Sequence, residues 1–111
     1  MHINFLTKQD KLYAKIIGEL DHHSAAEIKD RIDNKVISEG VNTLVFDFSE
    51  LVFMDSSGIG IIIGRYKLMK SLGGQVYIVS TNKSVDKLLL LSGIHDLVKV
   101  IDSVDEIEKM A

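Results

Sequence analysis

The chain of 111 residues contains no cysteine, no proline and no tryptophan. The absence of cysteine excludes disulfide frameworks, thiolate zinc sites and cysteine nucleophiles, and it is compatible with a reducing compartment. The sequence also lacks a Lys/Arg cluster interleaved with aromatic residues, which is the electrostatic footprint of nucleic-acid binding. We therefore expect no nucleic-acid partner, and any role in transcription has to act through another protein.

Long apolar runs are missing too. No stretch approaches the roughly 18 residues that span a bilayer, and residues 1–4 lack the basic and apolar regions of a signal peptide. The sequence therefore predicts a cytoplasmic protein with no membrane partner. Its length fits a single domain over residues 1–111, a size that buries roughly two-thirds of the unfolded surface.

Charge is distributed unevenly along the chain, whose formal net charge is −3. Residues 1–55 hold 6 basic and 10 acidic side chains, whereas residues 56–111 hold 7 basic and 6 acidic ones. The acidic excess therefore lies upstream of Ser56.

Hydrophobic patterning predicts an α/β fold with a mostly parallel sheet that begins with an antiparallel hairpin. Expected strands cover residues 3–5, 12–17, 44–48, 76–79 and 97–101, and expected helices cover residues 25–40, 59–72 and 84–91, with a last helix after Ser103. The order is β-β-α-β-α-β-α-β-α, in which crossover helices return the chain to the same sheet.

Three local patterns refine this outline. Ser24 and Glu27 match the capping box at a helix start. Residues 44–48 are almost continuously apolar, which predicts a central strand buried on both faces. Gly60 and Gly64 fall on one helical face, so we expect that face to approach the sheet or a neighbouring helix closely.

Asp55, Ser56, Ser57 and Gly58 lie where a loop from a buried strand enters a helix. One interpretation is a helix cap, because Ser and Asp are favoured there. The other makes a serine the acceptor of a phosphate, which free amides and the positive end of the helix dipole would hold. A phosphate adds about −1.5 to −2 charges at neutral pH and would repel an acidic partner surface.

A second polar cluster, Asp21, His22 and His23, lies between a predicted strand and the first helix. Adjacent side chains do not converge on a helix, and no third ligand is spaced for a metal site, so a metal site and a Ser-His-Asp triad are both disfavoured. We expect a partner-contacting loop beside Ser56, with no metal and no cofactor. Glycines 58, 60 and 64 match neither a dinucleotide fingerprint nor a P-loop.

The segments Gly-Glu-Leu-Asp-His-His (18–23), Phe-Met-Asp-Ser-Ser-Gly-Ile-Gly (53–60) and Gly-Arg-Tyr-Lys (64–67) together carry a family resemblance. They resemble the anti-sigma factor antagonists, bacterial members of the STAS domain family. The resemblance runs from the first strand to about Gly93 and is weaker in the last helix.

The resemblance implies a protein that switches partners and has no enzymatic activity. In that family the unphosphorylated antagonist binds an anti-sigma factor that is also a serine kinase and thereby releases a sporulation sigma factor. The kinase then phosphorylates the serine that follows the aspartate, here Ser56, and a serine phosphatase reverses the step. Ser57 matches the second, non-acceptor hydroxyl. The expected partner-binding residues are Asp21, His22, His23, Asp55, Ser56, Ser57 and Gly58.

Two other functions stay open on the residues alone. One is a small nucleotide-binding or hydrolysing domain that uses the Ser56 loop, with Asp55 or His22 as the base. The other is a receiver-like domain phosphorylated on Asp47 or Asp55. Binding of ATP or GTP would indicate the first, and an acid-labile phosphate would indicate the second.

Overall fold

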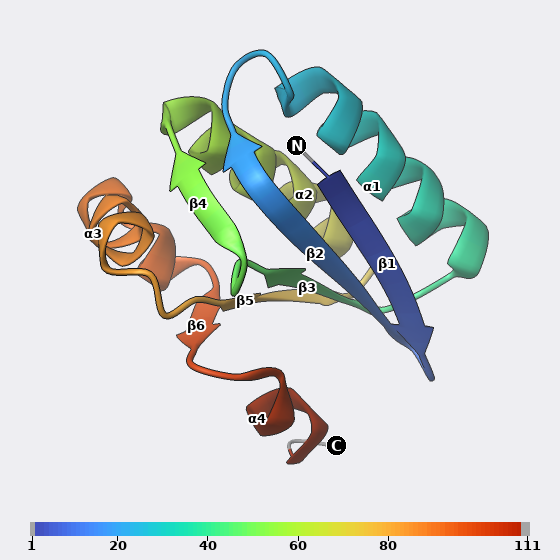
Figure 1. Cartoon of the computed structure of the whole chain (residues 1–111). Helices are drawn as coiled ribbons and strands as arrows, with labels where there is room; N and C mark the ends of the chain where they lie inside the picture. Colours follow the sequence, from blue (N-terminus) through green and yellow to red (C-terminus); the bar gives the residue numbers. More distant parts are fainter. Residues whose placement is uncertain (1, 110–111) are drawn as a thin grey trace.

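Six strands and four α-helices make up residues 2–109, the part of the chain that the computed structural model describes (Figure 1). In chain order they are β1 (His2–Lys8), β2 (Lys11–Leu20), α1 (Ala25–Glu39), β3 (Thr43–Asp47), β4 (Leu51–Met54), α2 (Ser56–Ser71), β5 (Gln75–Val79), α3 (Lys83–Ser92), a 3₁₀ turn (Ile94–Asp96), β6 (Lys99–Ile101) and α4 (Val104–Lys109). The predicted α/β class is confirmed.

The sheet has the order β1-β2-β3-β5-β6, with β4 paired to β2. β1 and β2 form the expected antiparallel hairpin, and Gln9 in its turn adopts a φ of 58°. The remaining pairings, β2 with β3, β3 with β5 and β5 with β6, are all parallel. All five residues of β3 are buried, as the apolar run predicted.

The short strand β4 was not predicted from the sequence. β2 pairs with β3 along its first half and with β4 along its last residues, and Gly18 marks the change with a φ of 98° and a shift of register. β4 has buried residues at its two ends and exposed ones, Val52 and Phe53, between them. This pattern lacks the alternation that identifies a strand. The helix at Ser56 therefore follows a half-exposed strand, which corrects the expectation of a fully buried one.

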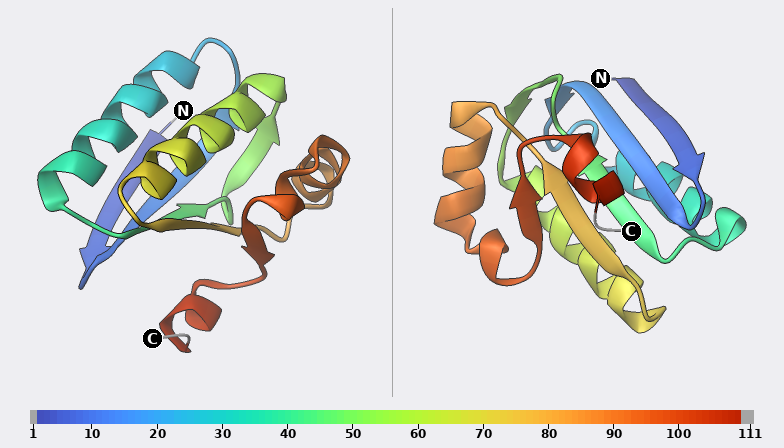
Figure 2. Two further views of the ribbon diagram at one scale, coloured as in Figure 1. Left: turned by 180° about the vertical axis from the view of Figure 1, so that it is seen from behind. Right: turned by 90° about the horizontal axis from the view of Figure 1, so that it is seen from below.

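The sheet is covered unequally on its two faces. Helices α1 and α2 lie side by side across one face, and Figure 2 shows them there in the view from behind. Ile28 and Ile32 of α1 and Ile62 of α2 belong to the larger core. On the other face a smaller cluster contains Tyr13, Val45, Val79, Ile101 and Ile107, the last of them from α4. The short helix α4 thus covers only part of this second face.

The predicted close approach at Gly60 and Gly64 is wrong. A Cβ atom added at either glycine would meet nothing within 4 Å. The tight positions are instead Gly58, where a Cβ would overlap Met54, and Gly74, where it would overlap the carbonyl of Asn42. Spacing identifies a shared helical face but does not say whether that face points to the core.

Replacing Gly60 by alanine is expected to raise the free energy of unfolding by about 0.5–1 kcal/mol, because glycine inside a helix costs conformational entropy and the site has space. Urea denaturation followed by circular dichroism measures the change. The matched variant Gly58→Ala should instead lose about 1–2 kcal/mol through overpacking. A destabilised Gly60→Ala protein would show that this face is packed after all.

Candidate functional site

Two loops meet at the carboxyl end of β2 and β4. The two strands are parallel, Leu20 pairs with Met54, and the amide of Asp55 donates to the carbonyl of Leu20 at 3.3 Å. Asp21 and Asp55 are therefore the first residues beyond two adjacent strands. Figure 1 shows both arrowheads at the same edge, where α1 and α2 begin. The structure thus brings the Asp21 cluster next to the Ser56 loop.

Asp55 is the N-cap of α2, the point that the sequence left open. Its backbone is extended, with φ −107° and ψ −170°, and its carboxylate accepts a hydrogen bond from the Ser57 amide at 2.8 Å. Ser56 is consequently the first helical residue, and it is exposed. A free hydroxyl at the surface is what a phosphate-transferring partner needs to reach.

Gly58 supports the Ser56 loop by packing closely against the ends of β2 and β4. It is buried, and a Cβ atom there would overlap Met54 and lie 3.2 Å from Cδ2 of Leu20. The glycine allows the first turn of α2 to press against the ends of both strands. Of the seven predicted site residues, Gly58 therefore has a buried position that supports the Ser56 loop.

The capping box predicted at Ser24 does not form. Ser24 adopts helical angles and its side chain caps no amide of α1. The carboxylate of Asp21 instead accepts from the amides of His23 at 2.9 Å and Ser24 at 3.1 Å, and Ser24 Oγ accepts from the Asp21 amide. Asp21 can accept these amide hydrogen bonds because one additional turn, at residues 21–24, precedes α1. The sequence contains residue types suited to capping, but Ser24 is paired with Asp21 and not with Glu27, as the capping box would require.

The charge of Asp21 is stabilised by this turn. Partial desolvation acts to raise the pKa of Asp21, but the amide hydrogen bonds from Ser24 and His23 outweigh it, so the pKa lies below its ordinary value. The two histidines are exposed and their rings stack at 4.2 Å. His23 Nδ1 lies 3.9 Å from Asp21 Oδ1. The loop therefore presents a fixed carboxylate together with two imidazoles.

An acidic hollow of about 400 Å³ adjoins the loop. It is lined by Glu19, Asp21, His23, Ser24 and Glu27. Glu19 and Glu27 were not among the predicted site residues, although the acidic excess before Ser56 pointed to this region. Three carboxylates around one hollow favour a basic partner surface.

Exposed apolar side chains lie directly before the Ser56 loop. Val52 and Phe53 of β4 are 68% and 48% exposed. Asn82, the N-cap of α3, donates from Nδ2 to the carbonyl of Leu51 at 3.2 Å and so ties α3 to β4. These residues were missed because β4 was not recognised as a strand. Asn82 follows the next parallel strand, β5. This position in the sequence could have indicated that Asn82 lies at the same edge of the sheet as Asp21 and Asp55.

The geometry offers little support for a metal site or for a receiver-like domain phosphorylated on Asp47 or Asp55. Within residues 2–109 no group of three or more His, Asp or Glu side chains is placed to hold a metal ion. Asp47 is only 8% exposed and its carboxylate accepts from the Ser49 amide at 3.0 Å, while Asp55 is engaged as a helix cap.

None of the described helices combines the length and the apolar character needed to cross a bilayer.

Comparison with known proteins places this geometry in a family. The STAS domain profile matches residues 2–107. The anti-sigma F factor antagonist of Paenibacillus polymyxa is 35% identical over 92 residues, which is 83% of this chain and 79% of that protein.

Two solved structures show the same fold. The Bacillus cell fate determinant SpoIIAA in its phosphorylated form has a TM-score of 0.77 at 23% identity and covers 99% of this chain and 100% of its own. An anti-sigma factor antagonist from Mycobacterium paratuberculosis has a TM-score of 0.88 at 18% identity, with 98% and 92% covered.

Proposed function

Because the chain belongs to the STAS domain family and is an anti-sigma factor antagonist of the SpoIIAA type, a class of regulators without enzymatic activity, we propose that phosphorylation of Ser56 controls its binding. The unphosphorylated protein binds a SpoIIAB-like anti-sigma factor that is also a serine kinase, and this releases a sporulation sigma factor. Phosphorylated Ser56 ends the interaction, and a SpoIIE-like serine phosphatase restores it. These steps take place in the cytoplasm.

The observation that carries the proposal is the position of Ser56. It is exposed, it begins α2, and it lies beside the Asp21 loop. A kinase can therefore reach its hydroxyl without unfolding any element. The residue that the kinase modifies then lies within the surface that binds the kinase.

The proposed contacts come from both loops. Asp21, His22 and His23 form one side, and Asp55, Ser56 and Ser57 form the other, with Gly58 holding the second loop in place. Phe53 and Val52 add apolar area beside these polar groups. An interface with a partly apolar centre and a charged rim is typical of specific protein complexes.

A phosphate on Ser56 would act locally. The Ser57 amide, which could otherwise hold it, is already bound by the Asp55 carboxylate. The new charges would therefore remain directed outwards, next to Asp55 and close to Asp21. The fold need not change, because added bulk and negative charge at the centre of an interface are enough to prevent docking.

The identity of the sigma factor is proposed from the relatives. The Paenibacillus polymyxa protein is named as an antagonist of an anti-sigma F factor. A 28% identical Staphylococcus aureus protein is named as an antagonist of an anti-sigma-B factor. The higher identity to the first protein supports an F-type sigma factor here.

Calorimetric titration of the full chain with its anti-sigma factor tests the proposal. We expect saturable binding that Asp21→Asn weakens by about tenfold, because this variant loses the charge but keeps an oxygen that can accept from the same amides. The matched control Asp105→Asn removes an exposed charge from α4 and should bind as the wild type does. Absence of binding by the wild type, or equal affinity for both variants, would contradict the proposal.

A further inference from the structure

Strand β1 forms one edge of the sheet and pairs only with β2 among the strands of residues 2–109 (Figure 1). It is seven residues long, pairs with β2 without a bulge and contains no proline, and its ionisable side chains, His2 and Lys8, lie at its two ends. The opposite edge strand, β6, has only three residues. Proteins commonly protect long edges with a proline, a bulge or a central charge. β1 lacks these devices and is open to one more strand.

The turn of the hairpin determines which backbone groups of β1 point outwards. Two residues separate Lys8 from its partner Lys11, and a turn of this length joins its flanking residues as a hydrogen-bonded pair. Hydrogen-bonded pairs recur at every second residue of an antiparallel ladder, so Ile3, Phe5 and Thr7 direct their N–H and C=O groups away from β2. Within the described chain these three residues make no backbone hydrogen bond outside the strand ladder.

A hollow lies between this edge and α1, which runs beside β1 in Figures 1 and 2. This Phe5 hollow has a volume of about 350 Å³ and is lined by Phe5, Arg31, Asn34, Lys35 and Ser38. Arg31 Cζ and Lys35 Nζ lie 5.8 and 5.9 Å from the centre of the Phe5 ring. The lining therefore contains two positive charges and no negative one.

The two cations of the Phe5 hollow are at most weakly neutralised. Lys35 Nζ lies 3.7 Å from Glu39 Oε1, an exposed pair of the kind that contributes little to stability. Arg31 takes part in no ion pair among residues 2–109. Glu27, one helical turn before Arg31, lines the acidic hollow beside Asp21 instead. The Phe5 hollow therefore favours a ligand that carries carboxylates.

We propose that β1 binds an extended acidic segment of another protein as an additional strand, hydrogen-bonded to Ile3, Phe5 and Thr7. Directly opposite residues of paired strands share a face of the sheet, so a segment residue opposite Phe5 points towards the two cations. Its neighbour in the segment points to the other face, beside Leu6, which pairs with Tyr13 there and is 61% exposed. The segment that fits alternates Asp or Glu with apolar residues.

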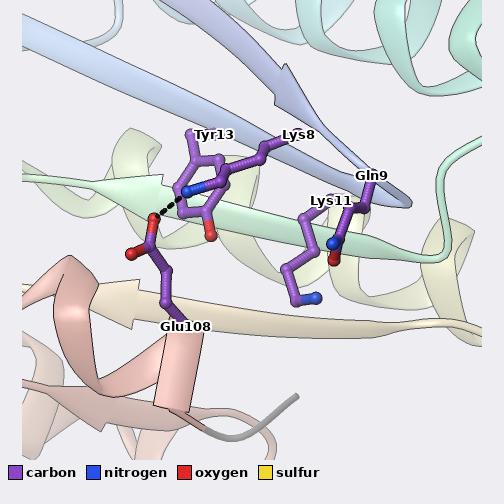
Figure 3. Close-up of a pocket in the computed structure, with 5 residues that line it drawn as sticks. All are labelled: Lys8, Gln9, Lys11, Tyr13 and Glu108. Carbon is purple, nitrogen blue, oxygen red and sulfur yellow. Dashed lines mark hydrogen bonds and ion pairs between the residues drawn. The ribbon is translucent and has the colours of Figure 1, made fainter.

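A second copy of this chain does not fit the same edge. β1 contains no Asp or Glu, so two paired β1 strands would bring together two sets of the same cations with no carboxylate in either strand. Glu108 does not supply one, because it lies 2.9 Å from Lys8 Nζ on the α4 face of the sheet, away from the Phe5 hollow (Figure 3). Charge complementarity therefore selects an acidic partner over self-association.

NMR titration of the isotope-labelled full chain with the blocked peptide Glu-Val-Glu-Val-Glu-Val-Glu tests the proposal. We expect saturable binding with a dissociation constant of about 0.1–1 mM. Amide hydrogen exchange should slow by at least about fivefold at Phe5 and Thr7 and much less at Asn4 and Leu6, because only the outward amides gain new acceptors. The same peptide with lysine in place of each glutamate should not bind.

Variants of α1 separate the hollow from general charge attraction. Arg31→Met and Lys35→Met should each weaken binding of the glutamate peptide by at least about threefold. The matched control Lys67→Met, which removes an exposed lysine from α2, should bind the peptide as the wild type does. Thermal melting verifies that each variant is folded. Equal affinity of Arg31→Met and Lys67→Met would overturn the proposal.

Two further results would also overturn it. One is equal binding of the glutamate and lysine peptides, or slowed exchange at Asn4 and Leu6 in place of Phe5 and Thr7. The other comes from sedimentation of the chain without peptide, for which we expect no dimer formed through β1. A dimer in which Phe5 and Thr7 are already protected from exchange would make a second copy the occupant of this edge.

Discussion

Phosphorylation of Ser56 is expected to weaken the complex with the anti-sigma factor by at least about 100-fold, equivalent to about 2.7 kcal/mol. The phosphate adds about −1.5 to −2 charges to a surface that already presents Asp21 and Asp55. Docking of that surface would require the new charges to lose their water beside two fixed carboxylates. The desolvation cost of the phosphate and its added bulk act in the same direction, so the loss is large although no element moves.

The variants that test this prediction are Ser56→Asp, Ser56→Ala and a control, Ser38→Asp. Ser38 is exposed near the end of α1, remote from the two loops, and its variant should bind normally. Ser56→Asp should bind weakly, and less weakly than the authentic phosphoprotein, because a carboxylate carries less charge. Ser56→Ala should bind and resist release by ATP. A folded Ser56→Asp protein with wild-type affinity would contradict the electrostatic account.

The second large effect concerns the ion pair that joins α1 to α2. Arg65 Nε lies 2.8 Å from Asp33 Oδ1, and the two side chains are 8% and 22% exposed. Their relative angle falls outside hydrogen-bond geometry, so the attraction is chiefly that of two close charges. Arg65→Met is expected to lower the free energy of unfolding by about 2 kcal/mol, below the usual cost of breaking a fully buried pair. The reason is that Asp33 keeps some water and lies 3.5 Å from Lys29 Nζ.

A decrease of this size lowers the melting temperature of a domain this long by roughly 8–12 °C. The double variant Arg65→Met/Asp33→Leu should recover most of it, because neither partner is then a lone charge between the helices. Thermal and urea denaturation of the single and double variants measure both effects. Equal stability of Arg65→Met and the wild type would show that the pair contributes nothing.

The order of the main elements was predictable because the sequence repeats a simple pattern. Residues 44–48 are apolar except for Asp47, a pattern that favours a strand buried on both faces, and Gly40 and Gly93 end helices in left-handed conformations. The strand β4 was not predictable by the same means. It is short, and it pairs only with the end of β2, after the register shift at Gly18.

Several details of the site depend on geometry that a linear pattern does not contain. Two residues with the correct spacing, Ser24 and Glu27, suggested a cap, yet Asp21 provides the hydrogen bonds because an additional turn precedes α1. Gly60 and Gly64 share a helical face, but that face is open. The sequence predicted that the Asp21 and Ser56 loops are adjacent, and the structure places them so, although the strand β4 that brings them together was not predicted.

The contact between α4 and the β1–β2 hairpin could not have been inferred from the sequence. Lys8 and Glu108 are separated by almost the whole chain, and only the return of α4 to the hairpin brings them together. Tyr13 fits the alternating pattern of a strand, and nothing in that pattern indicates that its hydroxyl has no hydrogen-bond partner among residues 2–109.

The central claim is that one serine at the start of α2 receives the phosphate that ends binding. Its most direct test is phosphopeptide mapping of the full chain after incubation with the cognate anti-sigma kinase and ATP. The account predicts a single acid-stable phosphate on Ser56, absent from Ser56→Ala, and loss of the kinase complex in proportion to its appearance. A phosphate found on Ser57, or an acid-labile one on Asp47 or Asp55, would contradict it.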